Sequence, residues 1–257
     1  MPLSSPESLA THPDRIIALP NAQNFRDLGG YPTARGGQTR WGVLFRADGL
    51  QYLADADIAL IKDLNIGHVI DLRSRDELKT RGTFPIDKHE VVFSNHAIID
   101  LSWSADETPV TNDAMEFLLW AYPEMLTKGA QRFADALHTI AHAHEPLVFH
   151  CAAGKDRTGL LAMMVLGLLG CDHDIIVADY EQSNAAMKRL TMWAEQHSQE
   201  LADRIGVTPA SFMSADGRAM RIIMDGLVAE HGSIRGYVSS LGVNDETLAL
   251  LEARLIS

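Results

Sequence analysis

The residues with the clearest chemical potential lie in one short segment, HCAAGKDRTG, from His150 to Gly159. Cys151 is one of only two cysteines in the chain, and Arg157 follows it in a C-x5-R pattern. The preceding run PLVFH predicts a buried strand, and the apolar stretch from Thr158 onward predicts a buried helix. The segment is therefore expected to form a tight loop between a strand and a helix.

A loop that enters a helix is suited to binding an anion. It presents free backbone N–H groups together with the positive end of the helix dipole. Gly154 allows such a loop to curl so that successive N–H groups point inward. The same environment favours the thiolate form of Cys151 at the start of the loop. The segment thus predicts an anion site beside a reactive thiolate.

The side chains of this loop fit phosphoryl transfer. A thiolate is a strong nucleophile toward phosphorus. The planar guanidinium of Arg157 can hold two phosphate oxygens, and these contacts strengthen as the transferring group becomes trigonal bipyramidal. Thr158 can donate its hydroxyl to the thiolate when the sulfur leaves, and His150 can orient the loop by hydrogen bonding. Cys151 and Arg157 are therefore the first candidates for a catalytic nucleophile and a phosphate clamp.

The composition narrows the classes of protein and partner. The chain has 257 residues, of which 46% are hydrophobic, and a formal net charge of −12. So acidic a surface attracts neither nucleic acid nor anionic lipid, and an anionic substrate has to be captured by local positive groups. Two cysteines do not make a disulfide scaffold, which favours a reducing compartment.

The chain also lacks the signals of a secreted or membrane protein. No basic segment followed by an apolar run opens it, and the longest apolar run, 160–170, is too short to span a bilayer. We therefore expect a cytoplasmic protein without stable membrane insertion. Export by a route that needs no N-terminal signal is the alternative, and the oligomeric state is not predicted.

The elements that must position the loop alternate between strands and helices. Short strands are expected near 43–45, over 69–72, in HEVVFSN and in PLVFH, with helices between them. From Ile175 onward the chain is expected to be mostly helical, with Asn244 capping the last helix. This order predicts an α/β protein in which helices cover a central sheet. Residues 1–20 are predicted to be a flexible tail and residues 21–257 a single domain.

Three further features carry expectations about the site. The irregular segment 98–109 is a candidate for a movable lid. The following segment, NDAMEFLLWAYPEML, predicts a helix that is interrupted near Pro123. The arginines 26, 46 and 73 are together candidates for a basic rim, but each taken singly is interpreted as a member of a surface ion pair.

The segment 150–159 resembles the phosphate-binding loop of the cysteine-dependent protein tyrosine phosphatases. Its Lys-Asp pair before the arginine resembles the bacterial, PtpB-type branch of that family. Further similar blocks are NFRDLGGY, LFRAD, VIDLRSRDE, VADYEQSN and HGSIRGYVSSLGV, so the resemblance covers roughly residues 20–243. It implies a phosphatase fold, with a central mixed sheet flanked by helices and a helical C-terminal part. It also implies a two-step hydrolysis without metal or other cofactor.

The resemblance assigns roles to individual residues of the loop. It implies that Cys151 is the nucleophile and that Arg157 binds the phosphate. The implied cradle consists of the backbone N–H groups of Ala152, Ala153, Gly154, Lys155, Asp156 and Arg157. Lys155 would add a second positive charge near the ligand. A lysine at this position also occurs in lipid-phosphatase loops, which adds phosphoinositides to the candidate substrates.

The general acid stays open among three aspartates. Asp156 lies in the loop itself and is favoured by the resemblance. Asp71 ends a predicted strand, where ligand crevices of α/β sheets are lined, although a salt bridge to Arg73 or Arg157 would equally explain it. Asp100 lies in the candidate lid, and its alternative role is that of a solvated surface charge.

The sequence therefore predicts a hydrolase of phosphomonoesters that acts through a phosphocysteine at Cys151. Phosphotyrosine in a phosphorylated protein is the first candidate substrate, followed by phosphoserine, phosphothreonine and phosphoinositides. Two other classes are weighed against it: a module that binds phosphorylated ligands without turnover, and a sulfurtransferase.

Overall fold

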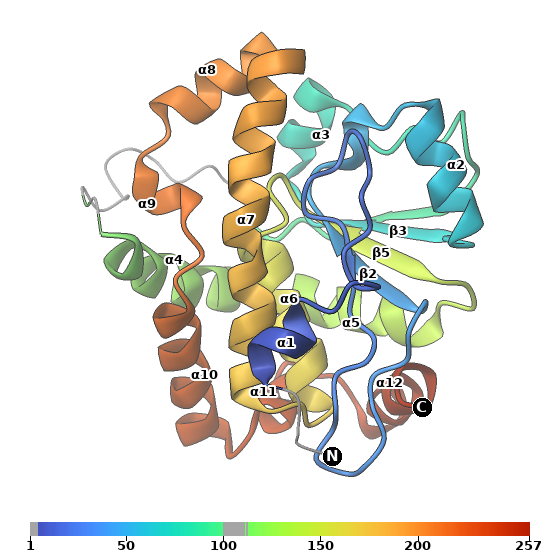
Figure 1. The fold of residues 1–257 in the computed structure, drawn as a ribbon. Helices are drawn as coiled ribbons and strands as arrows, with labels where there is room; N and C mark the ends of the chain where they lie inside the picture. The colour runs from blue at the N-terminus through green and yellow to red at the C-terminus, as the bar shows by residue number, and fades with distance from the viewer. Residues whose placement is uncertain (1–4, 100–110, 112) are drawn as a thin grey trace.

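The computed structural model describes residues 5–99, 111 and 113–257, and it contains a five-stranded mixed sheet in the order β1-β2-β5-β3-β4. β2, β5, β3 and β4 are parallel to one another, and β1 is antiparallel to β2. The strands are β1 (Arg26–Asp27), β2 (Leu44–Ala47), β3 (His68–Asp71), β4 (Val92–Asn95) and β5 (Leu147–His150). The strand that leads into the Cys151 loop, β5, is thus the middle strand of the sheet (Figure 1).

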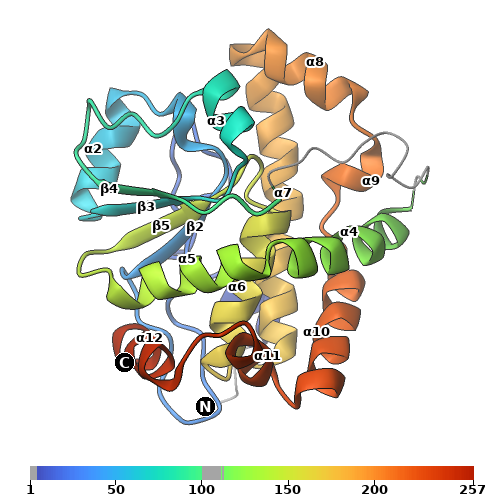
Figure 2. The same cartoon turned by 180° about the vertical axis from the view of Figure 1, so that it is seen from behind.

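Helices surround this sheet and form the rest of the molecule. They are α1 (Pro6–Ala10), α2 (Asp55–Asp63), α3 (Arg75–Arg81), α4 (Ala114–Lys128), α5 (Ala130–His142), α6 (Asp156–Leu168), α7 (His173–His197), α8 (Gln199–Val207), α9 (Ala210–Met213), α10 (Gly217–His231), α11 (Ile234–Ser240) and α12 (Asp245–Leu255), with a 3-10 turn, η1 (Leu50–Tyr52). Figure 1 shows the long helix α7 beside the sheet, and Figure 2 shows α5 and α4 on the opposite side.

The strands bury both of their faces, as expected of parallel strands covered by helices. Val148 of β5 points into a cluster that includes Ile58 and Ile61 of α2. Its neighbours Leu147 and Phe149 point the other way, into the larger core formed with α4, α5 and α6. Because successive side chains of a strand alternate between faces, β5 is held from both sides and its last residue is fixed in position.

The helix that follows the loop is the most deeply embedded helix of the body. From Thr158 to Leu168, every residue of α6 except Gly167 is buried. α6 packs against β2, β5, α4, α7 and α11, and it ends shortly before Cys171. Met163 and Met164 are wholly buried, so they belong to the core. A helix with no free face gives the loop at its N-terminus a rigid support.

Most sequence expectations for the fold are confirmed. The four expected strands appear as β2, β3, β4 and β5, and a short antiparallel unit precedes β2. The C-terminal part is helical, and the side chain of Asn244 accepts the N–H of Thr247 at the start of α12. No helix in the described part of the chain combines the length and the apolar character needed to cross a bilayer.

The expected flexible tail is wrong for residues 5–20. This stretch contains α1, which packs against α7, and the fully buried Arg15. The Arg15 guanidinium lies 3.6 Å from the centre of the Tyr31 ring, and it donates to the backbone oxygens of Leu9 and Asp27. A buried arginine with these partners ties the segment to the domain, although the composition of the segment is polar.

The expected interruption at Pro123 is also wrong, because α4 continues from Ala114 to Lys128 with Pro123 inside it. The side chains of Ala121, Tyr122 and Met125 on either side are buried. Proline removes one backbone hydrogen bond from a helix. Tertiary packing of this apolar face compensates for that loss.

Candidate active site

The Cys151 loop has the backbone shape that its sequence predicts. β5 ends at His150, and α6 begins at Asp156. Gly154 has φ +66°, a conformation that residues with a side chain rarely adopt. A Cβ atom at this position would lie 2.5 Å from the carbonyl oxygen of Ala47. Glycine is therefore required here both by the backbone conformation and by the close approach of β2.

A pocket of about 350 Å³ opens at this loop. The loop and the first turn of α6 contribute Cys151, Ala152, Ala153, Asp156 and Arg157 to its wall. The α3 region contributes Ser74, Glu77 and Arg81, and the remaining wall is apolar, from Ile98, Ile99 and Met125. Cys151 is 2% exposed and lies in the wall of this pocket, so a substrate group approaches the thiol from the pocket.

Arg157 is held by a carboxylate of α3. Its Nη1 lies 2.6 Å from Glu77 Oε2 and its Nη2 3.2 Å from Glu77 Oε1, which is a two-point contact. Burial opposes the charge of Glu77, but the bound guanidinium lowers the pKa of Glu77 to about 2. Burial also opposes the charge of Arg157, yet Cys151 and Glu77 hold its pKa above the ordinary value. Arg157 thus stays cationic at the edge of the pocket.

Asp156 is oriented by a pair of tyrosines. The hydroxyl of Tyr122 donates to Asp156 Oδ1 at 2.9 Å and lies 2.6 Å from the hydroxyl of Tyr180. The ammonium of Lys155 lies 3.3 Å from the same carboxylate oxygen. Among the residues that the structure describes, Oδ2 of Asp156 has no hydrogen-bond partner. One oxygen of this carboxylate is therefore anchored, and the other is available to the pocket.

Lys155 lies elsewhere than expected. Its ammonium donates to the backbone oxygens of Phe212 at 2.5 Å and Ser214 at 2.9 Å, and the side chain is 1% exposed. Lys155 does not line the pocket. The reason is local: the end of the short helix α9 leaves carbonyl oxygens without helical partners, and the ammonium binds them. The Lys155 side chain therefore does not line the pocket, although its positive charge lies next to the Asp156 carboxylate that does.

Asp71 forms a salt bridge with Arg73, which is the alternative to a role as general acid. Its Oδ2 lies 2.6 Å from Arg73 Nη2 and 3.4 Å from His150 Nε2, and all three side chains are fully buried. Burial opposes the charge of Asp71, but His150 and Arg73 hold its pKa below the ordinary value. His150 Nδ1 also lies 3.2 Å from the backbone oxygen of Cys151. This group therefore supports the start of the loop from behind and does not line the pocket.

A buried network attaches the loop to β1, β2 and α7. Arg46 donates to the backbone oxygen of Gly154 at 2.8 Å and to Asp179 Oδ2 at 2.6 Å. Asn24 donates to the backbone oxygens of Ala153 and Gly154, at 3.0 and 3.1 Å. Burial opposes the charge of Asp179, but its arginine partners hold its pKa well below the ordinary range.

The expectation of surface ion pairs is therefore wrong for the arginines 26, 46 and 73, which are at most 1% exposed. Arg26 donates to Asp179 at 2.9 Å, beside Arg46, and Arg73 pairs with Asp71. The blocks NFRDLGGY, LFRAD and VADYEQSN carry the first two arginines and their partner. The family resemblance includes these blocks, but no local sequence pattern indicates that residues so far apart in the chain meet in the interior.

The structure brings together Cys151, Ala152, Ala153, Asp156 and Arg157 on one pocket. Thr158 is fully buried directly behind them, and its hydroxyl has no hydrogen-bond partner in the described part of the chain. Asp100 and most of the candidate lid lie outside the described residues. Sequence reasoning missed Glu77, which VIDLRSRDE contains, and Tyr122, for which the sequence carries no signal.

Comparison with known proteins shows the family of the chain. A family model described as "Tyrosine phosphatase family" matches residues 17–257. The chain belongs to the tyrosine phosphatase family. It is 33% identical to the "Triple specificity protein phosphatase PtpB" of Mycobacterium tuberculosis, over 94% of this chain and 99% of that protein. It is 28% identical to a "Tyrosine-protein phosphatase" of Nostoc commune, over 82% of this chain and 73% of the relative.

Solved phosphatase structures are more distant from this tyrosine phosphatase family member. The catalytic core of Siw14 has a TM-score of 0.37 at 14% identity, covering 74% of this chain and 94% of that one. TpbA of P. aeruginosa has a TM-score of 0.29 at 19% identity, covering 56% of this chain and 71% of that one. Family membership rests on the sequence comparisons.

Proposed function

We propose that this phosphatase hydrolyses phosphotyrosine in proteins through a phosphocysteine intermediate at Cys151. One observation carries the proposal: the thiol of Cys151, the carboxylate of Asp156 and the guanidinium of Arg157 line the same pocket. These are the nucleophile, the proton donor and the anion clamp that phosphoryl transfer from a phenolic oxygen requires.

In the first step the Cys151 thiolate attacks phosphorus. The Sγ–P bond forms while the bond from phosphorus to the tyrosine oxygen breaks, and Asp156 gives its proton to that oxygen. Arg157 and the backbone N–H groups from Ala152 to Arg157 bind the three equatorial phosphate oxygens. Because negative charge accumulates on these oxygens in the transition state, donors that are already in position lower the barrier.

In the second step water attacks the phosphocysteine. The new O–P bond forms while the P–Sγ bond breaks, and the Asp156 carboxylate takes a proton from the water. The products are inorganic phosphate and the Cys151 thiolate. The buried hydroxyl of Thr158, which has no other partner in the described part of the chain, is suited to donate to the departing sulfur.

The role of Asp156 as acid and then base is supported by its contacts. Tyr122 and Lys155 hold Oδ1, so the carboxyl group is oriented while Oδ2 is left to the reacting oxygen. Asp71 is the weaker candidate because it is fully buried in an ion pair. We assign Asp71 and His150 a positioning role at the start of the loop.

The shape of the pocket supports an aromatic phosphate ester as the preferred substrate. Cys151 lies at 2% exposure, and Ile98, Ile99 and Met125 provide an apolar wall beside it. A phosphorylated aromatic ring can bury its faces against such a wall. Phosphoserine and phosphothreonine remain secondary candidates. Phosphoinositides have less support, because the ammonium of Lys155 is buried against backbone oxygens and does not line the pocket.

The direct test is turnover of p-nitrophenyl phosphate by the wild type and by Cys151→Ser. We expect the variant to lose essentially all activity, because a serine hydroxyl is not ionised at neutral pH. Cys171→Ser is the matched control and should retain turnover, since Cys171 lies beyond the far end of α6. Equal activity of the wild type and Cys151→Ser would overturn the proposal.

A further inference from the structure

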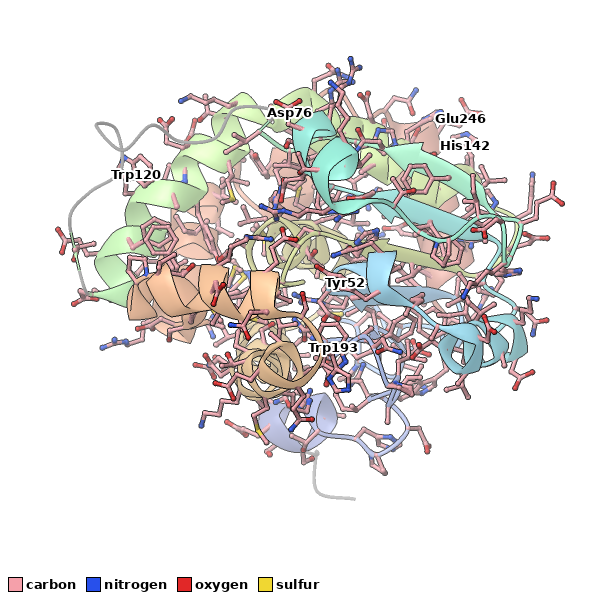
Figure 3. All side chains as sticks on the ribbon, turned by 90° about the horizontal axis from the view of Figure 1, so that it is seen from above. Tyr52, Asp76, Trp120, His142, Trp193 and Glu246 are labelled. Atoms are coloured by element: carbon pink, nitrogen blue, oxygen red, sulfur yellow. The ribbon has the colours of Figure 1, made fainter. Side chains whose placement is uncertain are left out.

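A second hollow lies directly beside the Cys151 pocket. Arg81 of α3 and Ala152 of the loop line both cavities, so they form the partition between the two. The outer hollow is also lined by Tyr52, Trp193 and Arg204. Figure 3 shows Tyr52 and Trp193 close together, and their ring centres are 5.2 Å apart. The free volume is about 30 Å³, which suits one small polar group at its opening rather than a ring.

The charges at this hollow are not balanced. The Glu77 carboxylate forms ion pairs with two arginines. Its Oε2 lies 2.6 Å from Arg157 Nη1, and its Oε1 lies 3.2 Å from Arg81 Nη1. Arg204, which is partly exposed, forms no ion pair with any residue that the structure describes. Burial lowers the pKa of Arg81, and the positive charge of Arg204 lowers it further. Two guanidiniums that disfavour each other are stabilised by an anion that reaches both.

The other charged groups at the hollow are already occupied. Arg73 is paired with Asp71. Asp48 is 2% exposed, and its carboxylate accepts the backbone N–H groups of Gln23 and Asn24. Neither side chain is available to neutralise Arg204 or to compete with a ligand for it.

The position of Arg204 is fixed by the packing of α8. Leu201 and Ile205 on the same helix pack against the cluster formed by Ala186, Met187 and Leu190 of α7. Ala153 of the catalytic loop packs against this cluster too. The apolar face of α8 is therefore anchored next to the loop, and Arg204 is presented at the hollow beside it.

We propose that Arg81 and Arg204 form a second anion subsite, which binds an acidic group adjacent to the phosphotyrosine of a peptide substrate. This inference rests on the proposed function, because it presumes that the phosphotyrosine occupies the Cys151 pocket. A peptide is favoured over a membrane because the net charge of −12 disfavours approach to an anionic lipid surface. Successive residues of an extended peptide are about 3.3–3.6 Å apart, so a flanking side chain can reach a neighbouring hollow.

The test compares two phosphotyrosine peptides that differ only in their flanking residues, alanine in one and glutamate in the other. The readout is the ratio of their kcat/KM values. We expect the wild type to favour the glutamate peptide by about two- to fivefold, the range of one exposed ion pair. The ratio should fall to about one in Arg204→Ala, invert in Arg204→Glu, and shrink for the wild type at high salt.

Arg35→Ala is the matched control. Arg35 is an exposed arginine paired with Glu252 of α12, so its removal changes the net charge equally and should leave the ratio unaltered. An unchanged ratio in Arg204→Ala, with turnover still dependent on Cys151, would overturn the subsite while leaving the proposed function intact. If Arg204 raised kcat/KM only for phosphoinositide vesicles and not for the glutamate peptide, the assignment of the subsite to peptides would be overturned.

Discussion

At the scale of single residues, the site depends on which carboxylates are paired with arginines and which one is available for proton transfer. Glu77, Asp71 and Asp156 all lie near the Cys151 loop, but Glu77 and Asp71 are engaged by arginines. Asp156 is held by a tyrosine hydroxyl and an ammonium on one oxygen only. A carboxylate locked by a guanidinium is poorly suited to give up and regain a proton, so the proton transfer falls to Asp156.

Asp156→Asn and Asp71→Asn should separate these two roles. A proton donor matters most when the leaving oxygen is strongly basic. We expect Asp156→Asn to reduce kcat for phenyl phosphate by about 100-fold or more, and to reduce it much less for p-nitrophenyl phosphate. Asp71→Asn should lower both rates by a similar factor. The measurement is kcat over a series of aryl phosphates, and a selective effect in Asp71→Asn instead would reverse the assignment.

At the scale of elements, the loop is shaped by its neighbours as much as by its own sequence. The motif predicted the strand, the loop, the helix and the need for Gly154, because those follow from local conformational rules. It did not predict that Lys155 turns toward the end of α9, or that Arg46 holds the loop from β2. Those contacts join residues far apart in the chain, and no local pattern specifies them.

Arg46→Lys should loosen the loop without removing the charge. Lysine cannot donate to Gly154 and Asp179 with the same planar geometry. We expect the inhibition constant of vanadate, which reports the shape of the anion cradle, to rise by about tenfold, as for the loss of one charge-assisted hydrogen bond. Arg15→Lys alters another buried arginine, one that makes no hydrogen bond to the loop. It should lower Tm but leave the inhibition constant of vanadate unchanged. Equal vanadate inhibition in all three proteins would exclude this role of Arg46.

At the scale of the whole molecule, stability rests on carboxylates that are paired in the interior. The pKa values of Asp71, Glu77 and Asp179 all lie below their ordinary values. Groups with a depressed pKa in the folded state stabilise it fully above their unfolded pKa, and this contribution is lost as the pH falls toward the folded value. The protein is therefore expected to lose stability below about pH 4 to 5.

Asp179→Asn tests this dependence. At pH 7 the variant should be less stable by about 3–5 kcal/mol, because two buried arginines lose their common partner. The difference from the wild type should narrow as the pH falls from 5 to 3, because in this range the Asp179 carboxylate of the unfolded chain takes up a proton while that of the folded protein stays ionised. Urea unfolding at several pH values in this range measures the free energy of unfolding of both proteins. A difference between them that stays constant with pH would contradict the prediction. The exposed Asp76, changed to asparagine, should have little effect at any pH.

The helix α6 also determines which groups can react with Cys151 after this residue is oxidised. Cys151 precedes its first turn and Cys171 follows its last, so a helix about 20 Å long separates the two residues. A disulfide needs Cα atoms within about 7 Å, and burial raises the pKa of Cys171 to about 12. The chain holds no third cysteine. Once Cys151 is oxidised to a sulfenic acid, its return to the thiol depends on a thiol from another molecule, because a neighbouring backbone nitrogen can trap it as a sulfenamide but cannot reduce it.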